Sequence, residues 1–217
     1  MKMPFSTEQF FSVFEQYNHA IFPGQMIILL FGLLSIVLIH TQRSSKDKLI
    51  GLILGLLWLW VGVVYHLGFF ARINPVARVF GFVFILQGLL IVYTAIQNRL
   101  RFTFKNQANE YVGYFFILFG LIIYPLIGFF IHYEPSGIIS LGLPCPTTIF
   151  TFGLFIMARN HFPKYLLIIP SLWAVAGISA AVNFGVKQDF MLILSAVVAI
   201  VFILTKKKRA VNQEISR

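Results

Sequence analysis

The sequence has few charged residues. Asp, Glu, Lys and Arg make up 11% of its 217 residues, less than half of the share of about 25% that is usual in soluble globular domains. Only seven residues are acidic, against 25 phenylalanines, so polar side chains cannot cover the surface of a soluble domain. The 17% of aromatic residues excludes an intrinsically disordered chain. The composition therefore indicates a polytopic membrane protein.

Cysteine and catalytic motifs are also scarce. A single cysteine, Cys145, excludes an intrachain disulfide. The sequence has no nucleophile elbow, zinc-protease motif or nucleotide loop, so no catalytic residue is assigned. Its histidines and its cysteine lack the local spacing of metal ligands, and no metal or other cofactor is predicted. The carboxylates all lie in loops or near the ends of apolar segments, which argues against an acidic proton relay inside a span.

Seven stretches contain no Asp, Glu, Lys or Arg and approach the roughly 20 residues that a membrane-crossing helix needs. They are residues 20–42, 49–71, 79–98, 111–133, 135–158, 165–186 and 190–205. Because lipid offers no hydrogen-bond partner to the backbone, these stretches predict helices. The predicted fold class is thus all-α, with a seven-helix transmembrane bundle over residues 20–205.

The basic residues predict how this bundle is oriented. One set of connections holds Arg43, Lys46, Lys48, Arg99, Arg101, Lys105, Arg159, Lys164, Lys206, Lys207, Lys208, Arg209 and Arg217, and the other set holds Lys2, Arg72, Arg78 and Lys187. Since cytoplasmic loops are rich in Lys and Arg, the N-terminus is predicted outside and the C-terminus in the cytoplasm. Residues 206–217 form a basic cytoplasmic tail that suits anionic lipid head groups. The net charge of +10 is therefore a signal of topology, and no nucleic-acid partner is predicted.

An amphipathic helix is predicted before the first span. Ser6 followed by Gln9 is typical of a capping box. The apolar stripe that follows consists of Phe10, Phe11, Phe14 and Tyr17. We expect residues 1–19 to form an interfacial helix on the outer membrane surface.

The fifth span contains an unusual string in which Pro144 and Pro146 flank Cys145 and are followed by Thr147 and Thr148. Two prolines so close together interrupt a helix, here near the middle of the bilayer. Transporters place binding sites at such interruptions, where freed backbone groups face a cavity. The alternative is a purely structural kink, with Cys145 as a small buried side chain.

Further polar residues fall within the spans, mostly in their outer halves. They are Tyr65, His66, Gln87, Tyr124 and Asn183. Polar groups in hydrocarbon are costly and often functional. Together with Cys145, Thr147 and Thr148 they predict a binding site in a cavity that opens to the outside and has the broken fifth helix as its floor. On the same side, Arg72 and Arg78 can anchor helices to lipid phosphate, pair with an acidic residue or attract an anionic solute.

Three functions are compatible with these features. The first is a small-solute permease or binding protein of the inner membrane, whose partners are the lipid bilayer and a small-molecule solute. The second is a membrane-embedded enzyme, or a redox or metal protein, that uses Cys145 with His66. The third is a structural or sensory membrane subunit. The oligomeric state is left open.

Three segments resemble a known family. They are MPFSTEQFF at residues 3–11, YHLGFF with INP at residues 65–75, and PCPTTIF at residues 144–150. Together they are similar to bacterial integral-membrane proteins classed only as a domain of unknown function. The resemblance implies a multi-pass protein of the bacterial inner membrane, and it implies no activity or catalytic residue.

Overall fold

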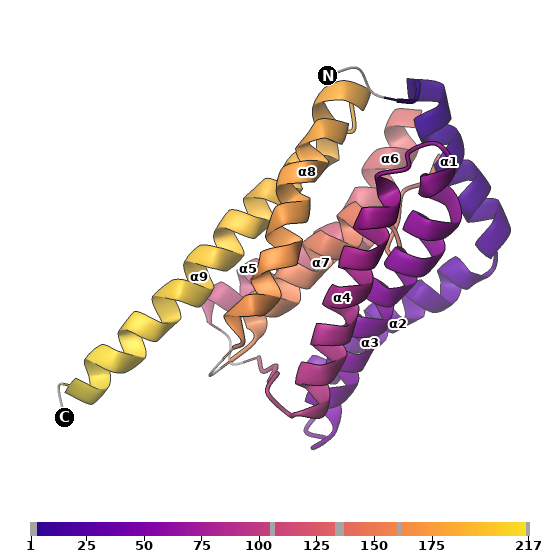
Figure 1. The fold of residues 1–217 in the computed structure, drawn as a ribbon. Helices are drawn as coiled ribbons and strands as arrows, with labels where there is room; N and C mark the ends of the chain where they lie inside the picture. The colour runs from indigo at the N-terminus through magenta and orange to yellow at the C-terminus, as the bar shows by residue number, and fades with distance from the viewer. Residues whose placement is uncertain (1–3, 105–106, 133–136, 160–161, 216–217) are drawn as a thin grey trace.

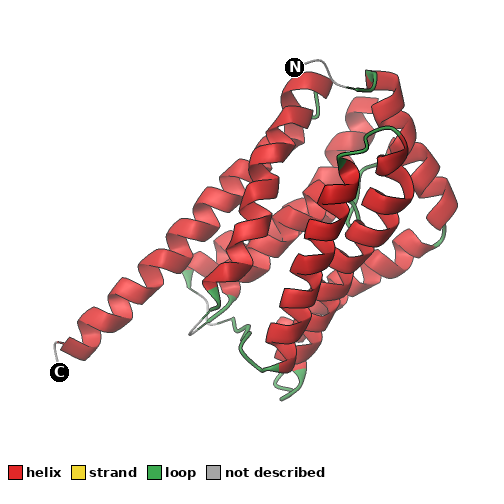
Figure 2. Ribbon diagram, in the orientation of Figure 1, coloured by secondary structure: helices red, strands yellow, loops and turns green. Residues whose placement is uncertain are grey.

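The computed structural model describes residues 4–104, 107–132, 137–159 and 162–215. Within these ranges the chain is helical and forms no β-strand beyond two isolated bridges (Figure 2). The α-helices are α1 (Thr7–Ile21), α2 (Gly24–His40), α3 (Lys46–Trp60), α4 (Ala77–Ile96), α5 (Ala108–Leu118), α6 (Tyr124–His132), α7 (Pro144–Met157), α8 (Ile168–Phe184) and α9 (Phe190–Ile215). Shorter helices are η1 (Val61–Phe69), η2 (Phe70–Arg72), η3 (Phe119–Ile123), η5 (Lys164–Leu167) and η6 (Lys187–Asp189). The all-α class is therefore confirmed for the described residues.

Within the described residues, five helical stretches are long and apolar enough to cross a membrane. They are Lys46–Arg72, Ala77–Ile96, Glu110–Ile131, Lys164–Phe184 and Lys187–Thr205. Helices α1 and α2 pass the same test as a pair but are bent by 89°, which makes up to six. The predicted seven-helix bundle is therefore not confirmed: the first predicted span counts only as this bent pair, and the segment expected as the fifth span forms only the 14-residue helix α7.

Helix α1 begins with the capping box expected from the sequence. The Gln9 N–H donates to the Ser6 hydroxyl at 3.3 Å, and the Ser6 N–H donates to the Gln9 side chain at 2.8 Å. The buried side of the helix carries Phe10, Phe14 and Tyr17, which pack on the rest of the protein. Its place at a membrane surface stays a prediction.

Glycines bring two pairs of helices into backbone contact. A Cβ on Gly55 of α3 would lie 3.0 Å from the Gly88 carbonyl oxygen of α4. A Cβ on Gly153 of α7 would lie 2.7 Å from both the Gly113 carbonyl oxygen and the Ile117 nitrogen of α5. Membrane helices associate through such small residues because lipid tails are as apolar as leucine and provide no hydrophobic drive.

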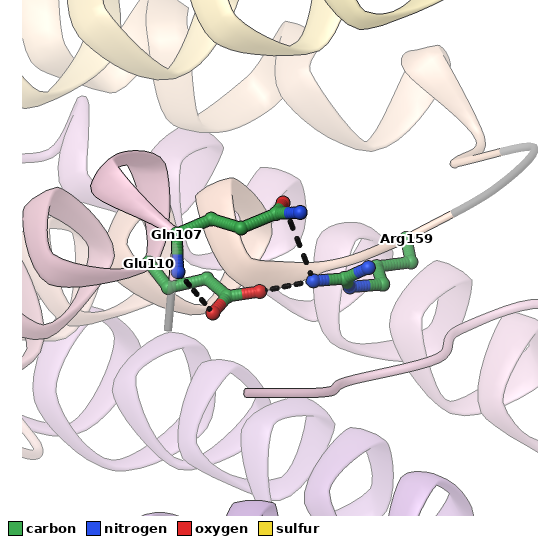
Figure 3. Close-up of polar contacts among 3 residues, drawn as sticks. All are labelled: Gln107, Glu110 and Arg159. Atoms are coloured by element: carbon green, nitrogen blue, oxygen red, sulfur yellow. Dashed lines mark hydrogen bonds and ion pairs between the residues drawn. The ribbon is translucent and has the colours of Figure 1, made fainter. Parts of the chain in front are cut away.

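The connections α2–α3, α4–α5 and α7–α8 meet at one end of the bundle, at the bottom of Figure 1. The Phe102 N–H donates to the Asp47 carboxylate at 2.8 Å, and the Arg159 N–H donates to the Arg101 carbonyl at 2.8 Å. Figure 3 shows the Arg159 guanidinium directed at the Glu110 carboxylate, with which it forms an ion pair. These contacts hold together the connections that carry most of the basic residues. Two of those basic residues, Lys105 and Arg217, lie outside the described residues.

We predict that Gly153→Ala lowers the free energy of unfolding by about 1–3 kcal/mol, because the added methyl meets backbone atoms that cannot move aside. Gly128→Ala in α6 is the matched control, since its Cβ would meet only the Gln188 Nε2 atom, at 3.9 Å. Thermal unfolding of both variants in the same detergent measures the difference. Equal stability of the two variants would contradict the close packing of α5 on α7.

Candidate functional site

Helix α7 begins deep inside the protein. Pro144 and Pro146 occupy its first turn, and the segment before it, residues 138–143, is not helical. The first intrahelical bond is donated by the Thr147 N–H to the Leu143 carbonyl at 3.2 Å. The prolines thus stand where N–H groups have no helical partner, and they start a helix instead of bending one. Every residue of α7 except Cys145 is buried.

The threonine hydroxyls of α7 are occupied by backbone and aromatic partners. Thr147 accepts from the Gly142 N–H at 3.0 Å, and Thr148 donates to the Pro144 carbonyl at 2.8 Å. One turn further, Thr151 accepts from the Trp58 indole N–H at 2.9 Å. Thr147 and Thr148 therefore satisfy the irregular start of the helix, and neither hydroxyl is directed at the thiol of Cys145.

A buried carboxylate lies beside Cys145. Asp189 is 2% exposed and accepts a short hydrogen bond from the Tyr124 hydroxyl, which is fully buried. The Cys145 thiol lies close to the same carboxylate and to the Trp173 indole. No Lys, Arg or His in the described ranges forms an ion pair with Asp189. The outcome is a polar cluster of acid, phenol and thiol inside an apolar protein.

Departures from regular α-helix place each member of this cluster. Tyr124 begins α6 directly after the π-helical turn η3. The next residue, Pro125, lacks an N–H, and its ring crowds the carbonyl four residues earlier, which lies in η3. Asp189 ends η6, which follows Gly185 in a left-handed conformation (φ 72°) at the end of α8. Cys145 lies in the first turn of α7.

Tyr65 lies near the cluster, in a second π-helical segment, η1. It is 3% exposed and lies near both Cys145 and Asp189. Its ring stacks on Phe14 and meets Tyr17 edge-on, at 5.8 and 5.6 Å between centroids. Helix α1 therefore packs on the ring of Tyr65.

The other predicted site residues lie apart from the acid. His66 is fully buried among aromatic rings, and neither ring nitrogen has a hydrogen-bond partner in the described structure. Its ring meets Trp173 at 5.2 Å between centroids, so this indole connects His66 with Cys145. Gln87 donates to the Leu166 carbonyl at 2.9 Å, and the exposed Asn183 donates to the Ser179 carbonyl of its own helix at 2.7 Å. The structure brings Cys145, Tyr65 and Tyr124 together, but not Asn183 or Gln87.

Asp189 was not among the residues predicted for the site. By sequence it ends a polar connection and precedes an apolar run, which is also the pattern of an ordinary helix N-cap. Its position at a span end was expected, and its burial was not; the same holds for Glu110, which is 0% exposed. No three His, Cys, Asp or Glu side chains of the described ranges are grouped so that they could hold a metal ion.

The described residues thus form an all-helical protein with several helices of membrane-spanning length and a buried polar cluster. Over residues 7–214 the chain matches the model of DUF6064, a family of unknown function, and it belongs to that family. Comparison with curated proteins and with solved structures gives no match.

We predict that Tyr124→Phe and Asp189→Asn are energetically coupled. Tyr124→Phe removes the hydroxyl that donates to the buried Asp189 carboxylate. Hydrogen bonds to charged groups contribute about 1.5–3 kcal/mol to the free energy of unfolding. A double-mutant cycle of unfolding free energies should give a coupling of that size. Tyr165→Phe is the control, since this hydroxyl pairs with Thr94 at 2.8 Å and should add independently to Asp189→Asn. Additive effects of Tyr124→Phe and Asp189→Asn would refute the pairing.

Proposed function

We propose that the chain is a multi-pass protein of the bacterial inner membrane that binds a small cationic solute at Asp189, Tyr124 and Cys145 and acts as its permease. The carrying observation is the burial of the Asp189 carboxylate without a basic partner among the described residues. An ionisable side chain kept inside a membrane protein at such cost most often marks a path for an ion or substrate.

The chemistry of the cluster favours a cation. A carboxylate offers only acceptors, and the Tyr124 hydroxyl and the Cys145 thiol add two further polarisable ligand atoms. The rings of Tyr65 and Trp173 lie beside them, and aromatic faces attract positive charge. A small amine or a similar organic cation matches this set better than an anion does.

The arrangement of the helices supports the proposed orientation. Helix α1 lies at one end of the bundle, and the C-terminal end of α9 lies at the opposite end (Figure 1). The basic connections fixed by the Glu110–Arg159 ion pair lie away from α1. This arrangement supports the proposal that α1 lies outside and the end of α9 lies in the cytoplasm, with segment 137–157 proposed as the fifth of seven crossings.

The single cysteine provides the test. In spheroplasts, the wild-type chain should react at Cys145 with membrane-impermeant methanethiosulfonates added from outside, because Cys145 alone among the α7 residues is partly exposed. The cationic ethyltrimethylammonium reagent should react faster than the anionic ethylsulfonate reagent. Asp189→Asn should reduce this rate ratio about tenfold, the change expected for about 1.4 kcal/mol of lost attraction.

Cys145→Ser sets the background for this experiment, and Asp47→Asn, at the opposite end of the bundle, is the matched charge control. Full labelling after denaturation together with none in intact membranes would overturn the proposal, since the thiol would then be sealed from water. A rate ratio that Asp189→Asn leaves unchanged would overturn the role of the carboxylate.

A further inference from the structure

A second polar feature lies on the surface at the α1 end of the protein, apart from the buried acid. It is a groove of about 600 Å³ between α1 and the end of the η1–η2 segment. The groove is lined by Glu15, Gln16, His19, Ala20, Phe69 and Arg72.

Arg72 forms the cationic side of this groove. Its guanidinium lies over the Phe69 ring, 4.8 Å from the centroid. No carboxylate of the described ranges is within ion-pair distance of it. Stacking on Phe69 orients the Arg72 guanidinium and leaves its N–H groups free to donate hydrogen bonds. Arginine binds oxyanions such as phosphate through two of these N–H groups at once.

Glu15 and His19 form the opposite side. They are four residues apart on α1 and therefore lie on one face of the helix, about one turn from each other. Glu15 is half-buried, and like Arg72 it has no ion-pair partner among the described residues. The groove thus holds one negative side chain, Glu15, and one positive side chain, Arg72, that form no ion pair with each other. Two separated opposite charges complement a zwitterion.

Apolar side chains continue from the groove. Ala20 lines it, and the corner between α1 and α2 that follows exposes Phe22 by 71%, Met26 by 58% and Ile27 by 54%. Exposed apolar residues next to a charged groove match a ligand with a charged head and a hydrocarbon tail.

We propose that this groove binds the phosphoethanolamine head group of a phospholipid. The phosphate lies on Arg72 and His19, the ammonium group on Glu15, and the acyl chains run along Phe22 and Met26. The proposal goes beyond the solute site and does not depend on Asp189.

Native mass spectrometry of the full chain, released from a non-denaturing detergent, tests the proposal with phosphatidylethanolamine, phosphatidylglycerol and phosphatidylcholine at equal concentration. Phosphatidylethanolamine should bind most, and Arg72→Gln should reduce its bound fraction about fivefold or more. Arg78→Gln is the matched control, because Arg78 is also exposed on this side but does not line the groove.

Glu15→Gln separates a zwitterion from a simple anion. It should abolish the preference for phosphatidylethanolamine over phosphatidylglycerol and leave total lipid binding near the wild-type level. Because Glu15→Gln keeps both shape and hydrogen bonding, it also serves if Arg72→Gln does not fold. Asp189→Asn should leave lipid binding unchanged, so failure here and failure of the solute site can be told apart.

Three outcomes would overturn the lipid site. They are equal binding to the wild type and to Arg72→Gln, an equal loss in Arg78→Gln, and wild-type lipid preference in Glu15→Gln. A further experiment adds free phosphoethanolamine to the phosphatidylethanolamine complex and measures how much lipid stays bound. If it displaces the lipid at equal concentration, the ligand is the soluble head group and the lipid source is refuted.

Discussion

Backbone groups that are buried away from water must find their hydrogen-bond partners within the protein, and this constraint is hardest to meet in residues 138–143, which are largely buried and form no helix. This stretch is neither helix nor sheet, so side chains from elsewhere supply the partners. The Tyr17 hydroxyl donates to the Gly142 carbonyl and the Asn18 amide donates to the Ile138 carbonyl, both at 2.9 Å. The Thr147 hydroxyl accepts from the Gly142 N–H. Helix α1 is thus part of the interior hydrogen bonding, and Trp60 holds Tyr17 in place through a 2.8 Å bond to its hydroxyl.

Departures from regular α-helix allow the polar cluster to form. Continuous α-helices would present ridges of apolar side chains to one another at the centre. Two π-helical segments, a left-handed glycine and a helix that starts at paired prolines instead direct a phenol, a carboxylate and a thiol to one place. Because π-helical turns are rare and cluster at functional sites, two of them beside a buried acid strengthen the case for function.

Local sequence patterns predicted the features that local physics controls. The apolar runs located the helices, Ser6 and Gln9 located the start of α1, and Pro144 and Pro146 marked an interruption. The sequence does not show whether these prolines bend a continuous helix or begin a new one. The answer depends on whether the preceding residues are helical, and hydrophobic periodicity does not reveal this in an all-apolar segment. The pairing of Tyr124 with Asp189 joins residues 65 positions apart, and that of Tyr17 with Gly142 joins residues 125 positions apart. Such contacts follow from tertiary packing, so neither hydropathy nor spacing identifies Asp189 as buried.

The all-round burial of α7 also bears on how the protein is made. A helix of 14 residues is about 21 Å long, which is less than the roughly 30 Å of hydrocarbon, and polar backbone precedes it. On its own, this segment is too short to cross a bilayer as a helix. Its neighbours α8 and α9 follow it in the chain, so the centre of the molecule is covered on that side only once these two helices have packed on α7. The buried surface of α7 is therefore completed only by the last two helices of the chain.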